Sequence, residues 1–234
     1  MTILCIETST SVCSAAICTD GVPGRQCISR EGSNHARLLP RYIEELLSFA
    51  REQDLSIEAV ALSEGPGSYT GLRIGTSTAK GLCYGLNIPL IPIPTLEVLC
   101  EAARQQSAIS NHQSSIIIPM IDARRMEIYT TVVTNGERVN GEKVRAVVVE
   151  NEASLYDGDE DVYYFGDGAE KCAKIFTKPN WHYVPDIVPE AQYMGQIIHH
   201  KSEIKDAKSV DLAYYEPFYL KEFVAAQSHV KGLV

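Results

Sequence analysis

The hydrophobic pattern of the first sixty residues sets the fold class. Residues 3–6, Ile-Leu-Cys-Ile, form a short continuous apolar run, which is typical of a strand buried on both faces. Two further strand-like runs follow at residues 12–19 and 25–30. The period then changes, because apolar residues between Leu38 and Ala50 recur at helical spacing with charged residues opposite. Three consecutive strands followed by a helix predict a mixed α/β fold.

The rest of the chain repeats this alternation. Strands are predicted at residues 57–63 and 88–93, with a glycine-rich loop and a small-residue helix between them and a further helix from Thr95. The second half has strand patterns at residues 116–121, 127–134, 144–149 and 162–165, a hairpin turn at Asn135-Gly136, and helices after residue 165 and at Pro189. The repetition predicts two similar lobes, residues 1–105 and 106–234, joined at a polar stretch.

Length and composition exclude several classes of protein. A chain of 234 residues with 45% hydrophobic residues can bury a proper core, and no apolar run approaches the length of a membrane span. Its start lacks the features of a signal peptide, so we expect a cytoplasmic protein that does not associate with membranes. The net charge of −9 argues against gripping a nucleic-acid backbone unaided.

The cysteines and histidines do not suggest a metal site. Seven cysteines occur without a Cys-x-x-Cys pair, which predicts small buried apolar side chains in a reducing compartment. No histidine has another histidine three or four residues away, so no helix presents a metal-binding pair. We therefore predict that the protein binds no metal and no cofactor.

The glycine-rich segment at residues 64–75 lies between a predicted strand and a predicted helix, where phosphates often bind. It is not a Walker A loop, and Thr70 occupies the third glycine position of a Gly-x-Gly-x-x-Gly motif. A phosphate loop is therefore only weakly indicated.

The helix after this loop has one side made largely of small residues, namely Gly71, Gly75, Thr78, Leu82 and Gly85. Each interior glycine costs a helix about 1 kcal/mol relative to alanine, so something must offset the cost. Close approach of another helix is the obvious candidate. The neighbour is either the preceding helix of the same chain or a helix of a partner subunit, and the pattern leaves both open.

At these residues the chain resembles the TsaB family, also called YeaZ. Five ordered motifs support the resemblance: Ile3-Leu4-Cys5-Ile6-Glu7-Thr8-Ser9; Asn34-His35 with Leu39-Pro40; the block from Gly65 to Gly75 that continues to Leu82; Asp122-Ala123-Arg124-Arg125-Met126-Glu127-Ile128-Tyr129; and Pro217-Phe218-Tyr219-Leu220-Lys221. Tyr69 stands where the family usually has phenylalanine, and Lys221 stands where it has arginine. The central block is the most specific of the five.

The resemblance implies an α/β, actin-like (ASKHA) fold of two ribonuclease-H-like lobes, whose mixed sheets are flanked by helices. It also implies a non-catalytic subunit that activates the catalytic protein TsaD in the threonylcarbamoyladenosine modification of tRNAs that read ANN codons. The expected partners are TsaD, the ATPase TsaE, and a second copy of the chain when TsaD is absent. Tight binding of tRNA by the chain alone is not expected.

The same resemblance implies where the sites lie. The predicted partner interface comprises His35, Leu39, Tyr42, Ile43, Leu46, Gly71, Gly75, Thr78 and Leu82. Glu7, Thr8 and Ser9 would form a vestigial phosphate-loop-like turn, and Asp122 and Arg124 would lie in the cleft between the lobes. No catalytic residue is expected, and the end of the chain would return to the first lobe.

Two enzymatic alternatives have less support from the residues. TsaD-type proteins carry a His-x-x-x-His pair on the first helix, whereas His35 has no mate here. An actin-like small-molecule kinase or ATPase could use the Glu7-Thr8-Ser9 turn, but its second phosphate loop would need a glycine where Ala123 stands. The arginines that follow Ala123 could bind an anion instead, or Asp122 could pair with one of them.

Overall fold

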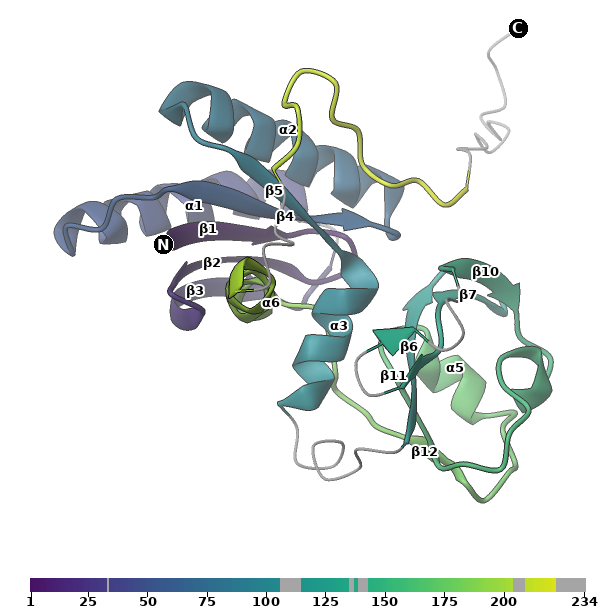
Figure 1. Cartoon of the computed structure of the whole chain (residues 1–234). Coiled ribbons are helices and arrows are strands. Elements are labelled where there is room, and N and C mark those ends of the chain that lie inside the picture. Colours follow the sequence, from purple (N-terminus) through teal and green to yellow (C-terminus); the bar gives the residue numbers. More distant parts are fainter. Residues whose placement is uncertain (33, 106–114, 135–136, 139–142, 204–208, 222–234) are drawn as a thin grey trace, which may run out of the picture.

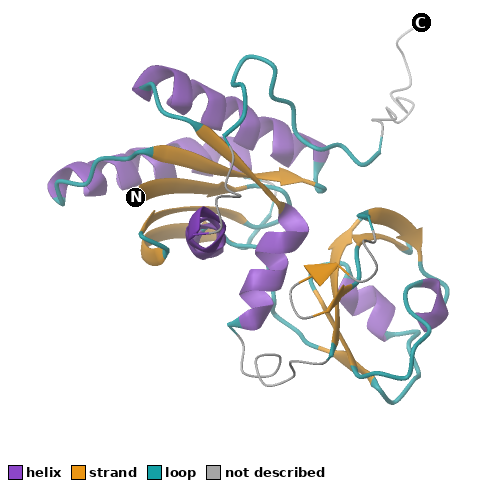
Figure 2. Cartoon of the chain, in the orientation of Figure 1, coloured by secondary structure: helices purple, strands orange, loops and turns teal. Residues whose placement is uncertain are grey.

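The computed structural model describes residues 1–32, 34–105, 115–134, 137–138, 143–203 and 209–221. It contains two mixed sheets with helices packed on their faces (Figures 1 and 2). Among the helices of the described residues, none is long and apolar enough to cross a bilayer.

The first sheet has the strand order β3-β2-β1-β4-β5. Its strands are β1 (Thr2–Glu7), β2 (Cys13–Thr19), β3 (Val22–Ser29), β4 (Ala59–Gly65) and β5 (Leu90–Pro94). The first three are antiparallel, and β4 and β5 join parallel to β1. Two long helices, α1 (His35–Glu52) and α2 (Tyr69–Leu86), lie side by side on one face of this sheet (Figure 1).

The second sheet repeats the topology of the first. Its order is β10-β7-β6-β11-β12, with a short additional pair formed by β8 and β9. The strands are β6 (Ile116–Asp122), β7 (Glu127–Thr130), β8 (Val133–Thr134), β9 (Glu137–Arg138), β10 (Arg145–Val148), β11 (Val162–Phe165) and β12 (Trp181–Tyr183). As in the first sheet, two antiparallel neighbours lie on one side of the central strand and two parallel ones on the other. This duplication confirms the predicted actin-like pair of ribonuclease-H-like lobes.

Several element bounds differ from the sequence prediction. The apolar run at residues 127–134 splits, because β7 pairs with β6 and β10 whereas β8 pairs with a different part of β6. The helix expected at Pro189 begins only at Gln192. After β11, the helix α5 (Ala169–Ala173) is short, and a 3-10 turn, η2 (Glu152–Ser154), precedes that strand. The hairpin turn predicted at Asn135-Gly136 lies outside the described residues.

Within the described residues, two helices connect the lobes. The helix α3 (Thr95–Arg104) contributes Leu96, Leu99 and Ala103 to a core shared with the second sheet. The helix α6 (Gln192–Glu203) returns to the first sheet, where Met194 and Ile198 pack on the face opposite α1 and α2 (Figure 1). The predicted boundary between the two lobes, at residues 105 and 106, adjoins residues that the structure does not describe, so it stays a prediction.

Residues 209–221, called the tail below, cross the first lobe and reach the second. The backbone of Val210 donates to Leu90 O, and that of Phe218 donates to Glu64 O. Tyr215 is buried in the core beneath α2, and the tail ends at Lys221, which forms an ion pair with Glu127 at the start of β7. The tail therefore contacts both lobes.

Candidate partner-binding surface

The apolar stripe of α1 faces the sheet of its own lobe. Leu39 and Leu46 are 0% exposed and Ile43 is 6% exposed, because all three pack in the core with β1 and β2. Side chains covered in this way cannot also lie on a surface open to a partner. The predicted interface is therefore revised at Leu39, Ile43 and Leu46, whose helical spacing indicated an apolar face without showing what covers it.

His35 connects the start of α1 to the preceding strands. It is buried, and its Nε2 lies 3.0 Å from Thr10 O and 3.2 Å from Val12 O, both beyond the end of β1. Asn34, the N-cap residue of α1, makes no capping bond with its side chain. The imidazole therefore fixes the entry of the helix onto the sheet, and it does not belong to an exposed interface.

The buried glycines of α2 explain the small-residue side of this helix. A Cβ on Gly71 would lie 2.0 Å from Thr8 O, and one on Gly75 would lie 2.3 Å from Thr8 Oγ1. Thr8 Oγ1 donates to Gly71 O at 2.8 Å. The neighbour that these glycines accommodate is thus the turn after β1, which neither explanation drawn from the sequence included.

The outward side of α2 shows a second pair of glycines with a different environment. Gly81 and Gly85 are exposed, and a Cβ on either would meet no described atom within 4 Å. Tyr84 between them is 85% exposed. Ser77 precedes Gly81 by one helical turn on the same side and is also exposed. Nothing in the described part of the chain requires glycine at positions 81 and 85.

The neighbouring helix adds charge to this outward side. Arg37, Arg41 and Glu44 of α1 are exposed, and α1 packs beside α2. Thr78 and Leu82 of α2 and Tyr42 of α1, three of the predicted interface residues, are half-buried. The name outer face is used below for Arg37, Arg41, Glu44, Ser77, Thr78, Gly81, Leu82, Tyr84 and Gly85.

The Glu7-Thr8-Ser9 turn is closed within the chain. All three residues are 0% exposed, and Glu7 Oε1 accepts hydrogen bonds from Ser9 N at 2.6 Å and Ser9 Oγ at 2.5 Å. Glu7 Oε2 has no hydrogen-bond partner among the described residues. Burial raises the pKa of the Glu7 carboxyl, although the bonds from Ser9 lower it.

The glycine-rich loop occupies the space beside this turn. Ser68 N donates to Ser9 O at 2.6 Å, and a Cβ on Gly67 would lie 2.2 Å from that same oxygen. Ser68 caps α2 by accepting the backbone N–H of Gly71 with its side chain. The polar groups that would cradle a phosphate here are thus engaged with one another.

In the second lobe, Asp122 and Arg124 lie where β6 turns into β7. Asp122 forms an ion pair with Lys171 of α5, which was not among the arginine partners considered from the sequence. The backbone N–H of Asp122 donates to Asp167 Oδ1 at 2.9 Å, and that of Arg124 donates to Asp122 Oδ1 at 3.3 Å. The sequence could not predict that Asp122 contacts Asp167 and Lys171, because these two residues belong to a distant segment of the chain.

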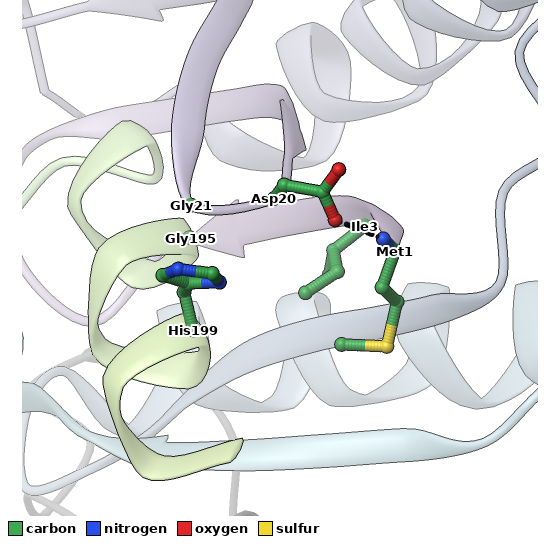
Figure 3. A pocket seen from close by; sticks show the side chains of 6 residues that line it. All are labelled: Met1, Ile3, Asp20, Gly21, Gly195 and His199. Carbon is green, nitrogen blue, oxygen red and sulfur yellow. Dashed lines mark hydrogen bonds and ion pairs between the residues drawn. The ribbon is translucent and has the colours of Figure 1, made fainter. Parts of the chain in front are cut away.

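A small pocket opens at the start of the chain, where β1, the β2–β3 turn and α6 meet (Figure 3). It has a volume of about 230 Å³ and is lined by Met1, Ile3, Asp20, Gly21, Gly195 and His199. The amino group of Met1 forms an ion pair with Asp20, so the carboxylate is already compensated. The volume is below the roughly 300–1,000 Å³ of typical cofactor pockets. Within the described residues, no group of three or more metal-ligating side chains occurs.

Comparison with known proteins identifies the family to which this architecture belongs. A model of the family described as TsaD, tRNA N6-adenosine threonylcarbamoyltransferase, matches residues 29–225. The chain belongs to the TsaD family. The match includes α1, α2 and the turn between β6 and β7, so all the elements that form the outer face lie within it.

Several curated proteins similar to this chain are named TsaB. The tRNA threonylcarbamoyladenosine biosynthesis protein TsaB of Haemophilus influenzae is 28% identical to this chain, over 96% of the chain and 95% of the relative. TsaB of Escherichia coli is 26% identical, over 96% of both chains. The solved structure of YeaZ from Pseudomonas aeruginosa has a TM-score of 0.74 and 23% identity, and covers 94% of this chain and 99% of that chain. The chain thus resembles TsaB along its length and shares the YeaZ fold.

Proposed function

We propose that this chain is a non-catalytic subunit in tRNA threonylcarbamoyladenosine biosynthesis that binds a TsaD-type catalytic protein through the outer face. The observation that supports this most strongly is the pair of exposed glycines, Gly81 and Gly85. Each costs α2 about 1 kcal/mol relative to alanine, and the chain's own fold requires neither. Close approach of a partner helix explains both.

The arrangement of the Glu7 turn also favours a binding role over a kinase or ATPase activity. The backbone of the glycine-rich loop packs on Ser9 O, and Thr8 Oγ1 is bonded to Gly71 O. A phosphate bound there would have to displace these contacts. The chemistry is then performed by the partner, and binding to the outer face would stabilise the partner's working conformation.

The charges of the outer face are compatible with a second copy of this chain when the partner is absent. Arg37 and Arg41 of the outer face lie in the first turns of α1, while Glu44 of the same face lies further along the helix. An antiparallel pairing of two α1 helices would bring opposite charges together. The homodimer, the additional subunit TsaE and cytoplasmic location remain parts of this proposal.

Reconstitution tests the proposed function. The TsaD-type protein of the same genome should co-elute with this chain and should transfer threonylcarbamoyl groups to tRNA much faster in its presence. The isolated chain should show no ATP turnover in the presence of magnesium. Full transfer activity of the TsaD-type protein alone, or turnover of ATP by the isolated chain, would contradict the proposal.

A further inference from the structure

The turn between β6 and β7 carries two consecutive arginines in a strained backbone conformation. Arg124 has a φ of +71° and Arg125 a φ of +50°. The other non-glycine residues with positive φ in the described chain are Asp20, Asp54, Asn87 and Asp186. Aspartate and asparagine tolerate this left-handed region, whereas long side chains rarely adopt it. At this turn alone, the described chain uses arginine where folding favours a different residue.

Both guanidinium groups also lack an ion-pair partner among the residues that the structure describes. Arg124 and Arg125 are exposed, and within the described residues neither side chain forms a hydrogen bond or an ion pair. The two acids of the same turn already have lysine partners, since Asp122 pairs with Lys171 and Glu127 pairs with Lys221. Asp167, the third acid nearby, accepts the backbone N–H of Asp122. A locally basic site thus stands out on a chain of net charge −9.

We propose that Arg124 and Arg125 bind phosphate groups of an RNA backbone, namely that of the tRNA held by the assembled complex. This proposal rests on the function proposed above. Guanidinium groups match phosphate oxygens in geometry and remain charged at any physiological pH. The backbone strain is then retained because it presents two adjacent arginines at the tip of one turn.

Two phosphate contacts contribute only a small part of the affinity for a tRNA. The acidic chain alone is therefore expected to bind tRNA weakly, while the complex uses the turn as an additional contact. A negatively charged protein surface is the competing occupant, but the RNA backbone offers regularly spaced phosphates with the geometry that arginine forks recognise.

The test replaces the arginine pair by residues that suit the turn. The double variant Arg124→Asn/Arg125→Gly removes both charges and relieves the positive φ values, so the chain should unfold at a higher temperature than the wild type. The matched control Lys143→Asn/Lys174→Asn removes the same charge from two exposed positions of the same lobe. Each variant is assembled with the TsaD-type protein, and tRNA binding is measured from about 50 to about 200 mM salt.

For the turn variant we expect a dissociation constant for tRNA that is roughly tenfold higher. The slope of the logarithm of the binding constant against the logarithm of the salt concentration should be smaller in magnitude by about 1 to 2. The control should keep the wild-type slope. An unchanged slope and affinity for the turn variant would overturn the proposal, as would loss of co-elution with the TsaD-type protein, which would assign the turn to a protein contact. If the wild-type chain does not assemble with the TsaD-type protein, that result contradicts the proposed function itself.

Discussion

At the residue scale, the glycines of α2 divide into two groups by what surrounds them. Gly71 and Gly75 are required by the turn after β1, while Gly81 and Gly85 face open space. The sequence showed that this helix carries a costly number of glycines, but the spacing could not show which neighbour each one accommodates. That information depends on Thr8, more than sixty positions earlier in the chain.

Two alanine substitutions on the same helix should have opposite effects on stability. Gly71→Ala would place a Cβ 2.0 Å from Thr8 O, so we expect it to lower the free energy of unfolding by about 1–3 kcal/mol. Gly81→Ala meets no described atom and should raise it by about 1 kcal/mol. Urea unfolding of the isolated chain measures both. Equal changes in the free energy of unfolding for the two substitutions would show that Gly71 does not lie close to Thr8.

The buried carboxyl of Glu7 predicts a pH dependence of stability. Because burial raises its pKa in the folded chain, the group favours folding most when protonated, below the ordinary glutamate pKa of about 4.3. This contribution is lost as pH rises through the folded-state pKa. Glu7→Gln, which stays neutral, should therefore be more stable than the wild type at pH 7 and similar to it near pH 4. A stability difference that does not vary between these pH values would contradict the assignment.

At the element scale, the tail ties α2 to the core and to the second lobe. Lys80 Nζ donates to Ala213 O at 3.3 Å and to Tyr215 O at 3.2 Å, while the ring of Tyr219 lies 5.0 Å from that of Tyr69. The resemblance predicted that the end of the chain returns to the first lobe; residues 222–234 lie outside the described residues, so for them this stays a prediction. The anchoring residues could not be predicted, because the tail is irregular and lacks a hydrophobic period.

Tyr215 is the side chain of the tail whose environment is most informative. It is 9% exposed, and its hydroxyl has no hydrogen-bond partner among the described residues. Tyr215→Phe should therefore leave stability unchanged or raise it by up to about 1 kcal/mol, whereas Tyr215→Ala should lower it by about 3 kcal/mol or more. Thermal unfolding separates the outcomes. A large loss with phenylalanine would mean that the hydroxyl is bonded in solution.

At the scale of the whole molecule, the sequence predicted the two lobes better than the surfaces. The runs at residues 3–6 and 57–63 correspond to β1 and β4, and the repeated pattern corresponds to two sheets whose main strands follow equivalent orders, β3-β2-β1-β4-β5 and β10-β7-β6-β11-β12. The family resemblance placed Leu39 and Leu46 on an interface, yet the structure covers them with the chain's own sheet. An apolar stripe shows that a helix face is buried, and only the tertiary structure shows whether the covering surface is its own.

The central claim is that the outer face binds a TsaD-type protein through close approach at α2. The most direct test is calorimetric titration of the TsaD-type protein with the Gly81→Leu and Gly81→Ala variants of this chain. Leucine and alanine are both strong helix formers, and position 81 contacts no other described atom, so both variants should keep the chain's own fold. The alanine variant should bind nearly as tightly as the wild type. The leucine variant should bind at least about tenfold more weakly, a loss of about 1.4 kcal/mol, because its side chain would separate the helices. Equal affinities for the two variants would contradict the claim.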